Sequence, residues 1–537
     1  MSGFTTLPSE LTDEIFSRIS RTDLLNTSLT CRTLHQKSIR SINRFLKISV
    51  RPETRIQETV AEKLFSTAFT DVSLECLREI EVVGVGLGGA GSRDIASRHV
   101  YLVSGEGSVG RKQEGYVEAE AFFNVRLREL LGRLQPGQIR AFSYTLPPPQ
   151  LPLNLLTEKF FEPQTLSALF APENRLTKLD ITFSHSISSD CNVFNLPHLT
   201  TFTSRASDYT AHYHSLFSIL FNTQKTLREL YCHNERHISR PRQRTASQRS
   251  SESLFFMHDG FAEWKQCTKC GLDNPPSVPS KRRIRLTELR VWRIDGLSHM
   301  MTEVFGPYNV VQGSRLTDVE IAVGSLAFVK LTAAEGGTLE LEKLLEHANG
   351  TQISPSSQEL GTYFGCTKGL VKVTLNFHRD IGFGWLEALK GSAETLRELH
   401  FSSVYGNMVV TEDEIEGLGR SLQKLEMLTV SSDCDLPICI MNSSTFPRLR
   451  YFGNRAYSNF DPGAKRRLED FMWSNSDQAS LSTSIRLICF RLPGQNYLIE
   501  RTFPNGNNGS VDIEIINVDD SKVPGILEGL GEAPRFG

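Results

Sequence analysis

Two short segments combine residue types and spacings that are typical of nucleotide or metal sites. Gly84-x-Gly86-x-x-Gly89 follows an apolar run, and Glu106 comes after a second apolar stretch. This order matches the dinucleotide-binding fingerprint, whose glycines let a backbone approach a pyrophosphate at a helix N-terminus. However, Gly91 stands early in the helix that this function requires, and no further doubly wound pattern lies beside it. A glycine-rich loop between early strands accounts for the same letters, so we predict no cofactor.

The second segment is Cys267-x-x-Cys270, which has the spacing of half a zinc knuckle. Zinc needs four ligands in a tetrahedral array. The upstream candidates Cys232, His233 and His237 are separated from it by an Arg-, Ser- and Pro-rich stretch typical of disorder. We therefore predict free thiols in an insertion and no metal site.

The sequence offers no convincing catalytic constellation. It contains neither Gly-x-Ser-x-Gly nor His-Glu-x-x-His, and its 13 histidines are scattered. We therefore predict that the protein is not an enzyme and has no catalytic residue.

Composition limits the class of protein further. The 537 residues are 39% hydrophobic, and 61 acidic residues nearly balance 59 basic ones, for a formal charge of −2. This argues against a disordered chain and against a dedicated nucleic-acid binder. We expect no membrane span, because no apolar run reaches the roughly 18–20 residues required. The absence of a signal-like N-terminus and of a dense cysteine framework predicts a cytoplasmic or nuclear protein.

Residues 6–46 predict three short helices. A helix can begin after Pro8, and Leu11, Ile15 and Ile19 then recur every four residues, on one face. A module of this size buries too little surface to be stable alone. Its apolar residues therefore either dock on another protein or cap the domain that follows.

The same segment resembles the F-box motif. The agreement comprises Leu7-Pro8, Glu10-Leu11, Ile15, Ile19, Asp23-Leu24-Leu25 and Cys31-Arg32. The resemblance covers residues 4–46 and implies docking on the S-phase-kinase-associated adaptor of a cullin–RING ubiquitin ligase and, through the adaptor, on a cullin. By that pattern, the adaptor-contacting or framework residues are Leu7, Pro8, Glu10, Leu11, Ile15 and Leu24.

A Leu-x-x-Leu-x-Leu string recurs through the rest of the chain. Copies begin at Leu176, Leu227, Leu286, Leu316, Leu370, Leu396 and Leu425, weaker ones at Leu199 and Leu449, and earlier ones at Phe45, Leu77 and Ile139. Most spacings are near the roughly 20–29 residues of a leucine-rich repeat. We therefore predict an α/β fold in which a leucine-rich-repeat-like solenoid spans 47–500, with an insertion at about 233–283 and a tail at 501–537. Many F-box proteins combine the motif with such repeats, so this pattern resembles the same family.

Side-chain alternation within each strand predicts an outward-facing column. Its members are Asp180, Tyr231, Arg290, Glu320, Thr374, His400 and Thr429, with Trp292 two residues beyond Arg290 on the same face. Aromatic residues and arginines are common anchors of interfaces. The column is therefore our candidate surface for an unknown target protein, although each residue taken singly fits an ordinary solvated position. Its mixed charge does not identify the target.

The insertion ends in Lys281-Arg282-Arg283, and its Ser247 and Ser250 stand among arginines. A solvated loop is the simplest interpretation; an acidic partner and phosphorylation are hypotheses. Together the patterns predict a substrate receptor of an SCF-type ubiquitin ligase that contacts neither membrane nor nucleic acid. The alternatives are a ligase-independent scaffold and, through Gly84 to Gly89, a nucleotide-binding enzyme.

Overall fold

The computed structural model forms two compact units, Met1–Leu289 and Arg290–Gly537, referred to below as unit 1 and unit 2. The residues that it describes are 7–19, 21–50, 71–84, 124–145, 162–171, 173–183, 196–206, 213–234, 284–295, 314–323, 326–339, 357–377, 384–403, 412–430, 446–455, 487–492, 495–502 and 512–518. The sequence features at 85–123 and 235–283, which include Glu106, the cysteine pair and both serines, lie outside these ranges.

Unit 1 begins with a three-helix module. Its described helices are α2 (Ser9–Arg18), α3 (Arg21–Ser28) and α4 (Arg32–Asn43). Helix α2 begins directly after Pro8, where the fixed proline φ suits a helix start. Cys31 caps α4, because its sulfur accepts a hydrogen bond from the Leu34 amide at 3.5 Å. Phe16 and Leu24 are buried in the module.

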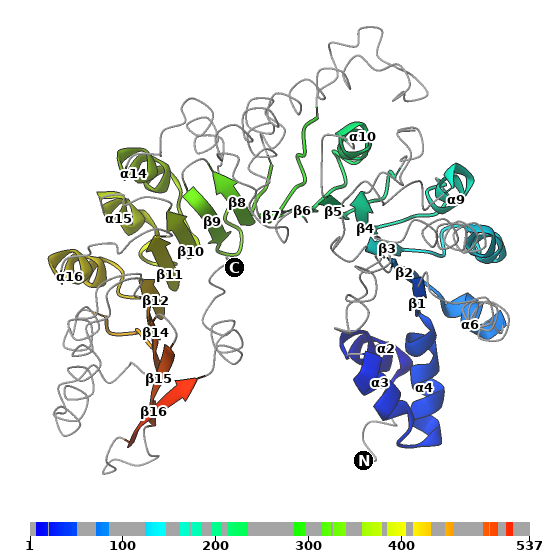
Figure 1. The fold of residues 1–537 in the computed structure, drawn as a ribbon, viewed down its shortest axis with the longest axis horizontal. Helices are drawn as coiled ribbons and strands as arrows, with labels where there is room; N and C mark the ends of the chain where they lie inside the picture. Colours follow the sequence, from blue (N-terminus) through cyan, green and yellow to red (C-terminus); the bar gives the residue numbers. More distant parts are fainter. Residues whose placement is uncertain are drawn as a thin grey trace, which may run out of the picture. The chain divides into compact units, whose positions relative to one another are not determined.

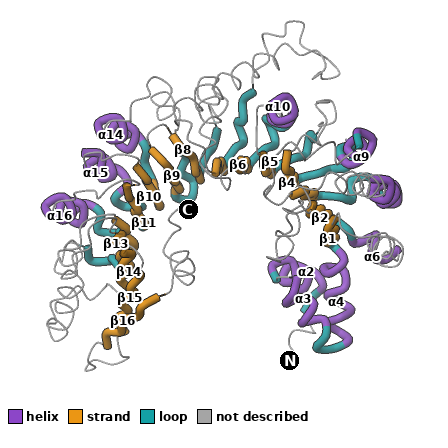
Figure 2. Tube along the Cα trace, viewed as in Figure 1, coloured by secondary structure: helices purple, strands orange, loops and turns teal. Residues whose placement is uncertain are grey.

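Parallel strands follow the module in chain order (Figure 2). The described strands of unit 1 are β1 (Phe45–Val50), β2 (Glu79–Gly84), β3 (Ala141–Thr145), β4 (Lys178–Phe183), β5 (Thr201–Ala206) and β6 (Glu229–Asn234). Each pairs with the next in parallel. Parallel neighbours need a connection that crosses back over the sheet. This requirement explains the long segments between them.

Helices supply part of these connections in unit 1. They are α6 (Asp71–Cys76), helical residues 124–133, α9 (Pro163–Leu169) and α10 (Tyr213–Asn222). In Figure 1, α9 and α10 lie on the same side of the strands. The apolar residues of the repeated string point to that side, as the edge-to-face contact between Phe142 of β3 and Phe170 after α9 shows, with ring centroids 6.4 Å apart. The core of unit 1 is thus a layer between its strands and its helices.

Unit 2 repeats this arrangement with an irregularity. Its described strands are β7 (Val291–Asp295), β8 (Asp318–Val323), β9 (Leu326–Ala333), β10 (Leu370–Phe377), β11 (Glu398–Ser403), β12 (Met427–Val430), β13 (Tyr451–Arg455), β14 (Leu487–Leu492), β15 (Gln495–Thr502) and β16 (Asp512–Val518). β9 runs antiparallel to both β8 and β10, and β14, β15 and β16 form antiparallel pairs. Regular structure therefore continues past residue 500, into the predicted tail.

The helical elements of unit 2 also lie to one side of its strands (Figure 1). They are α14 (Ser357–Cys366), α15 (Gly384–Ala388), the short 3-10 helix η6 (Leu389–Ser392) and α16 (Glu412–Ser421). Trp385 of α15 is fully buried between Phe364 of α14 and Phe401 of β11, at centroid distances of 5.9 and 5.7 Å. Large aromatic side chains therefore join helix to helix and helix to strand.

The strand register corrects the frame of two of the predicted repeats. In β7, Trp292 lies opposite Val319, so the string is Leu289-x-x-Trp292-x-Ile294 rather than one beginning at Leu286. In β1, Leu46 lies opposite Ile80, so the frame that begins at Phe45 is also wrong. Apolar residues recur every two or three positions around both strands. The Leu-x-x-Leu-x-Leu string can therefore be placed with more than one starting residue, and the sequence alone does not choose between them.

Candidate binding surfaces

The three-helix module leaves several leucines exposed. Leu11 of α2 is 49% exposed, Leu25 of α3 is 43% exposed and Leu29, just after α3, is 82% exposed. Single exposed leucines are common on protein surfaces, but three on so small a module are a candidate docking surface. Leu11 was predicted from the motif pattern, whereas Leu25 and Leu29 were missed as site residues. The sequence could have indicated them, because Leu24, Leu25 and Leu29 lie within six residues and one face of a short helix cannot bury all three.

The remaining predicted adaptor residues divide into surface and framework. Pro8 is exposed, and Leu7 and Ile15 are half-buried, whereas Leu24 is buried at 3% exposure and so serves the module's own core. Glu10 lies in α2. Lys37 of α4 donates a hydrogen bond to the Leu7 carbonyl at 2.8 Å, which holds the Leu7-Pro8 segment against the last helix.

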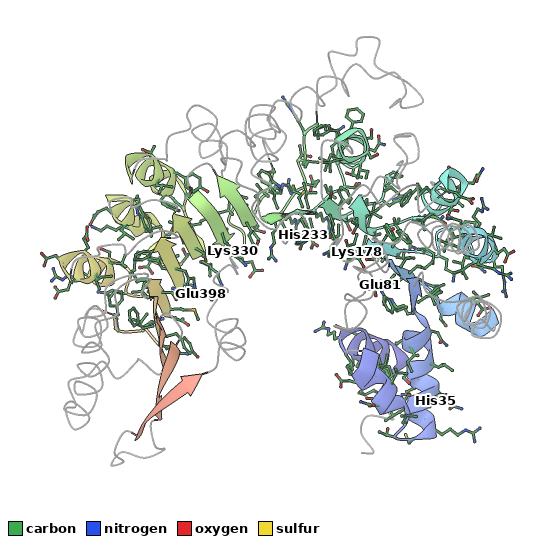
Figure 3. The ribbon with its side chains drawn as sticks, in the orientation of Figure 1. His35, Glu81, Lys178, His233, Lys330 and Glu398 are labelled. Atoms are coloured by element: carbon green, nitrogen blue, oxygen red, sulfur yellow. The ribbon has the colours of Figure 1, made fainter. Side chains whose placement is uncertain are left out.

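The strands present a second surface on the side away from the helices. In unit 1 the register aligns Glu81, Ser143, Asp180, Thr203 and Tyr231 in one row across neighbouring strands. Figure 3 labels Glu81, Lys178 and His233 along this side. The predicted positions of Asp180 and Tyr231 therefore agree with the register.

One ion pair and one hydrogen bond link neighbouring strands on this face. Arg205 of β5 holds both carboxylate oxygens of Asp180 on β4, at 2.9 and 3.0 Å. Glu229 accepts a hydrogen bond from Thr201 at 3.2 Å. A bidentate Arg–carboxylate pair fixes the orientation of both side chains. Asp180 is thus held in place by its own neighbour.

The same face of unit 2 is also charged and internally paired, both in the row that contains Glu320 and His400 and two positions before it. Arg293 holds both oxygens of Asp318 at 3.0 and 3.1 Å, and Lys330 of β9 lies 3.2 Å from Glu320. On the next strands, Lys372 lies 2.7 Å from Glu398. Figure 3 labels Lys330 and Glu398 on the side of the strands away from the helices. Because β9 lies between β8 and β10, Lys330 stands between Glu320 and Thr374. Without β9, Glu320 would face Thr374 and would have no lysine beside it.

His400 lies at the centre of this row but is largely buried. Its Nε2 atom is 3.7 Å from Glu398 Oε2 and has no hydrogen-bond partner among the described residues. Burial is the main cause that lowers the pKa of His400, so the imidazole is neutral at pH 7. The nearby His400 imidazole and then the Lys372 ammonium lower the pKa of Glu398 to about 2, although partial burial opposes this shift.

Four predicted residues of unit 2 take register positions in the row: Glu320, Thr374, His400 and Thr429. Thr374 and His400 are each only 6% exposed, so they offer a partner little surface. Glu320 and Thr429 are half-buried.

The other two predicted residues of unit 2 do not lie on this face. Trp292 is fully buried, and its prediction as a surface anchor is wrong. Arg293 takes the outward position, whereas Arg290 lies just before β7, where its carbonyl accepts from the Thr317 amide at 2.8 Å. Both errors follow from the three-residue shift in the repeat frame.

The described residues offer little for bond chemistry. No group of three metal-ligating side chains occurs among them. Burial raises the pKa of the Cys232 thiol to about 12, so this cysteine carries no thiolate at neutral pH. Among the helices that the structure describes, none has both the length and the apolar character that a bilayer crossing needs.

Comparison with known proteins identifies the N-terminal module. No curated protein matches the chain. Residues 4–45, which contain α2, α3 and α4, match the family model described as F-box domain. The chain therefore carries an F-box domain at its N-terminus.

Proposed function

We propose that this protein is a substrate-recognition subunit of an SCF-type cullin–RING ubiquitin ligase. The F-box domain at residues 4–45 is the observation that carries the proposal. F-box domains generally bind S-phase-kinase-associated adaptors, and the exposed Leu11, Leu25 and Leu29 offer the apolar area that such docking would bury. The adaptor would in turn connect the chain to a cullin.

In this proposal the successive strand-and-helix repeats are of the leucine-rich-repeat type and build a solenoid. The support is a repeated string whose apolar residues occupy matching register positions, with helices on one side of the strands in each unit. Such arrays present extended surfaces suited to partners. The proposed target-binding surfaces are the row of unit 1 that contains Asp180 and Tyr231 and, separately, the row of unit 2 that contains Glu320 and Thr429.

The proposed mechanism is proximity. A target held by the strands and an adaptor held by the F-box would bring target lysines near the charged ubiquitin enzyme, which raises their effective concentration. No residue of this chain would make or break bonds, so the protein itself would not be an enzyme. We propose the cytoplasm or nucleus as its compartment, where the free thiols of Cys31, Cys76 and Cys232 would stay reduced.

One observation favours a second candidate, a ligase-independent scaffold whose helices only cap the strands. Helix α4 leads into β1 almost without a break, and the Arg44 carbonyl accepts hydrogen bonds from the Arg78 and Glu79 amides at 2.8 and 3.0 Å. The module would thus cover the first strand whether or not it binds an adaptor.

The test is affinity purification of the intact chain beside a Leu11→Gln/Leu25→Gln/Leu29→Gln variant, read for adaptor and cullin. Exposed leucines contribute little to folding, and glutamine keeps a good helix propensity. Loss of their burial at an interface should weaken adaptor binding by about a hundredfold. Val125→Gln is the matched control, because Val125 is also exposed but lies in unit 1 outside the module.

Recovery of adaptor and cullin by the intact chain and by Val125→Gln, with loss in the triple variant, would support the ligase. Equal recovery by the triple variant would refute docking through these leucines. Absence of adaptor and cullin from every sample, with other partners retained, would favour the scaffold.

A further inference from the structure

The edge of unit 1 at which its strands begin is strongly basic. Five segments form this edge, here called the basic edge: residues 135–140, 173–177, 196–200, 224–228 and 284–289. The first four lead directly into β3, β4, β5 and β6. Backbone hydrogen bonds tie them together, since the Thr177 carbonyl accepts from the Thr200 amide and the Thr200 carbonyl accepts from the Arg228 amide, both at 2.8 Å.

Basic side chains dominate these segments. The exposed basic residues are Arg140, Arg175, Lys225, Arg228 and Arg285. The two acidic residues are Glu173 and Glu288, so the edge carries a net charge of +3 in a chain whose total is −2. This local excess is therefore a property of the edge and not of the whole protein.

Two of the arginines are held together by the fold. Arg140 donates to the Arg175 carbonyl at 3.4 Å. Gly137 has φ +74°, and a Cβ on it would lie 3.5 Å from Arg175 Cγ, so the Arg175 stem packs across this glycine. Within the described residues, neither guanidinium forms an ion pair. Both side chains carry a positive charge, and an anion bound beside them could accept hydrogen bonds from either guanidinium.

The other basic residues extend this pair along the edge. Neighbouring strands lie about 4.8 Å apart, so the segment that holds Lys225 and Arg228 lies two strands from the one that holds Arg175. The Arg285 amide donates to the Gln224 side chain at 3.3 Å, which places the last segment beside the 224–228 loop. The basic residues thus form a row whose length suits an extended polypeptide.

Some basic residues at the same repeat positions of unit 2 are already neutralised. Arg397, just before β11, lies 3.8 Å from Glu426, just before β12, and Lys424 pairs with Glu394. These pairs cross the same kind of strand edge. The sheet therefore accommodates carboxylates beside such arginines, whereas no carboxylate in the described part of the chain pairs with Arg140 or Arg175.

We propose that the basic edge binds a segment of the target protein rich in aspartate and glutamate. Arginine forms bidentate hydrogen bonds with carboxylates, as Arg205 and Arg293 do within this chain. The identity of the partner as a ligase target rests on the proposed function, whereas the binding of an acidic peptide does not require it.

A polypeptide fits this edge better than a nucleic acid. The exposed Glu173 and the half-buried Glu288 lie among the basic residues, where they would repel a uniform row of phosphates. A peptide of mixed sequence can place an amide or a lysine opposite them. The overall charge of −2 also provides no long-range attraction for a polyanion.

The test uses the purified full-length chain without adaptor, so that its failure is separate from failure of the ligase proposal. A fluorescently labelled peptide in which glutamate and aspartate are interspersed with glutamine serves as the probe, with binding followed by anisotropy. We expect saturable binding that weakens as salt rises. Arg140→Glu/Arg175→Glu should weaken it by at least about tenfold, and Arg140→Gln/Arg175→Gln by less.

The matched control is Arg18→Glu/Arg420→Glu, which makes the same change in charge on exposed helix positions. It should bind the peptide as the intact chain does. If the glutamate variant fails to fold, as judged by circular dichroism, the glutamine variant decides the question. Three results would overturn the proposal: no peptide binding by the intact chain, equal loss in the control, or a single-stranded oligonucleotide that binds the same arginines as tightly as the peptide.

Discussion

At the scale of single residues, burial and neighbouring charged groups together set the protonation of Glu398 and His400 in unit 2. The nearby His400 and then Lys372 lower the pKa of Glu398, and burial lowers the pKa of His400, which is therefore neutral at pH 7. The ion pairs on this face of unit 2 are partly exposed, so each contributes modestly to stability. A target that bound here would have to replace these internal partners with its own groups.

Glu398→Gln tests this balance. The folded-state pKa of Glu398 falls from an ordinary value of 4.5 to about 2. Its charged form therefore stabilises the fold above pH 4.5, and the benefit is lost as pH falls towards 2. We expect the substitution to lower the free energy of unfolding by about 1 kcal/mol at pH 7, with the difference shrinking below pH 4.5. Urea unfolding across this pH range is the measurement.

Glu335→Gln removes an exposed carboxylate from the turn after β9 and serves as the control. A stability difference for Glu398→Gln that stays constant from neutral to acidic pH would contradict the role assigned to its ion pair.

At the scale of elements, the close approach of neighbouring strands constrains individual positions. Gly453 of β13 lies directly opposite Thr429 of β12. A Cβ at Gly453 would lie 3.0 Å from Thr429 Oγ1 and 3.1 Å from Cγ2. Because Cγ2 and Oγ1 branch from the same carbon, rotation of the threonine only exchanges one close atom for the other. The strand pair therefore leaves little room for a side chain at Gly453 unless Thr429 shifts.

Gly453→Ala should accordingly lower the free energy of unfolding by about 1–3 kcal/mol, the usual cost of overpacking. Thr429→Ala removes both crowding atoms, so the Thr429→Ala/Gly453→Ala double variant should recover most of that loss. A double-mutant cycle measured by denaturant unfolding gives the coupling. Simple additivity of the two single changes would show that the clash is relieved in some other way.

At the scale of the whole molecule, the F-box domain is directly connected to the strands of unit 1. The Arg44 side chain lies 3.1 Å from Glu79 of β2, and its carbonyl joins the backbone ladder of the same strand. This connection leaves no flexible tether between the F-box domain and the first strands. If the protein is a ligase receptor, the fixed connection would help to orient a bound target.

Insertion of a Gly/Ser-rich linker between Arg44 and Phe45 tests this role. We expect adaptor binding and target binding to persist separately, whereas ubiquitin transfer to the target in a reconstituted reaction should fall by about tenfold or more, because a flexible linker lowers effective concentration. The same linker appended after Gly537 is the control. Unchanged transfer with the inserted linker would show that the direct connection has no role in positioning.

Much of the fold followed from local patterns. Pro8 marks the start of α2, the F-box resemblance agrees with the family match at 4–45, and the leucine string predicted strands and their buried residues at Leu179, Leu230 and Leu399. These predictions succeeded because they depend on alternation and spacing within a short stretch of chain.

Other features, such as which side chain of β7 is buried, depend on how distant strands pair. Leu286, Leu289 and Trp292 are spaced three apart, so only the register with β8 shows that Trp292 is buried and Arg293 faces outward. The antiparallel insertion of β9, the crowding at Gly453 and the Arg140–Arg175 pair likewise join residues far apart in the chain. The spacing of apolar residues within each strand was enough to predict the repeat and its buried face. Tertiary structure decided which charges meet, because hydrogen bonding between distant strands sets their alignment.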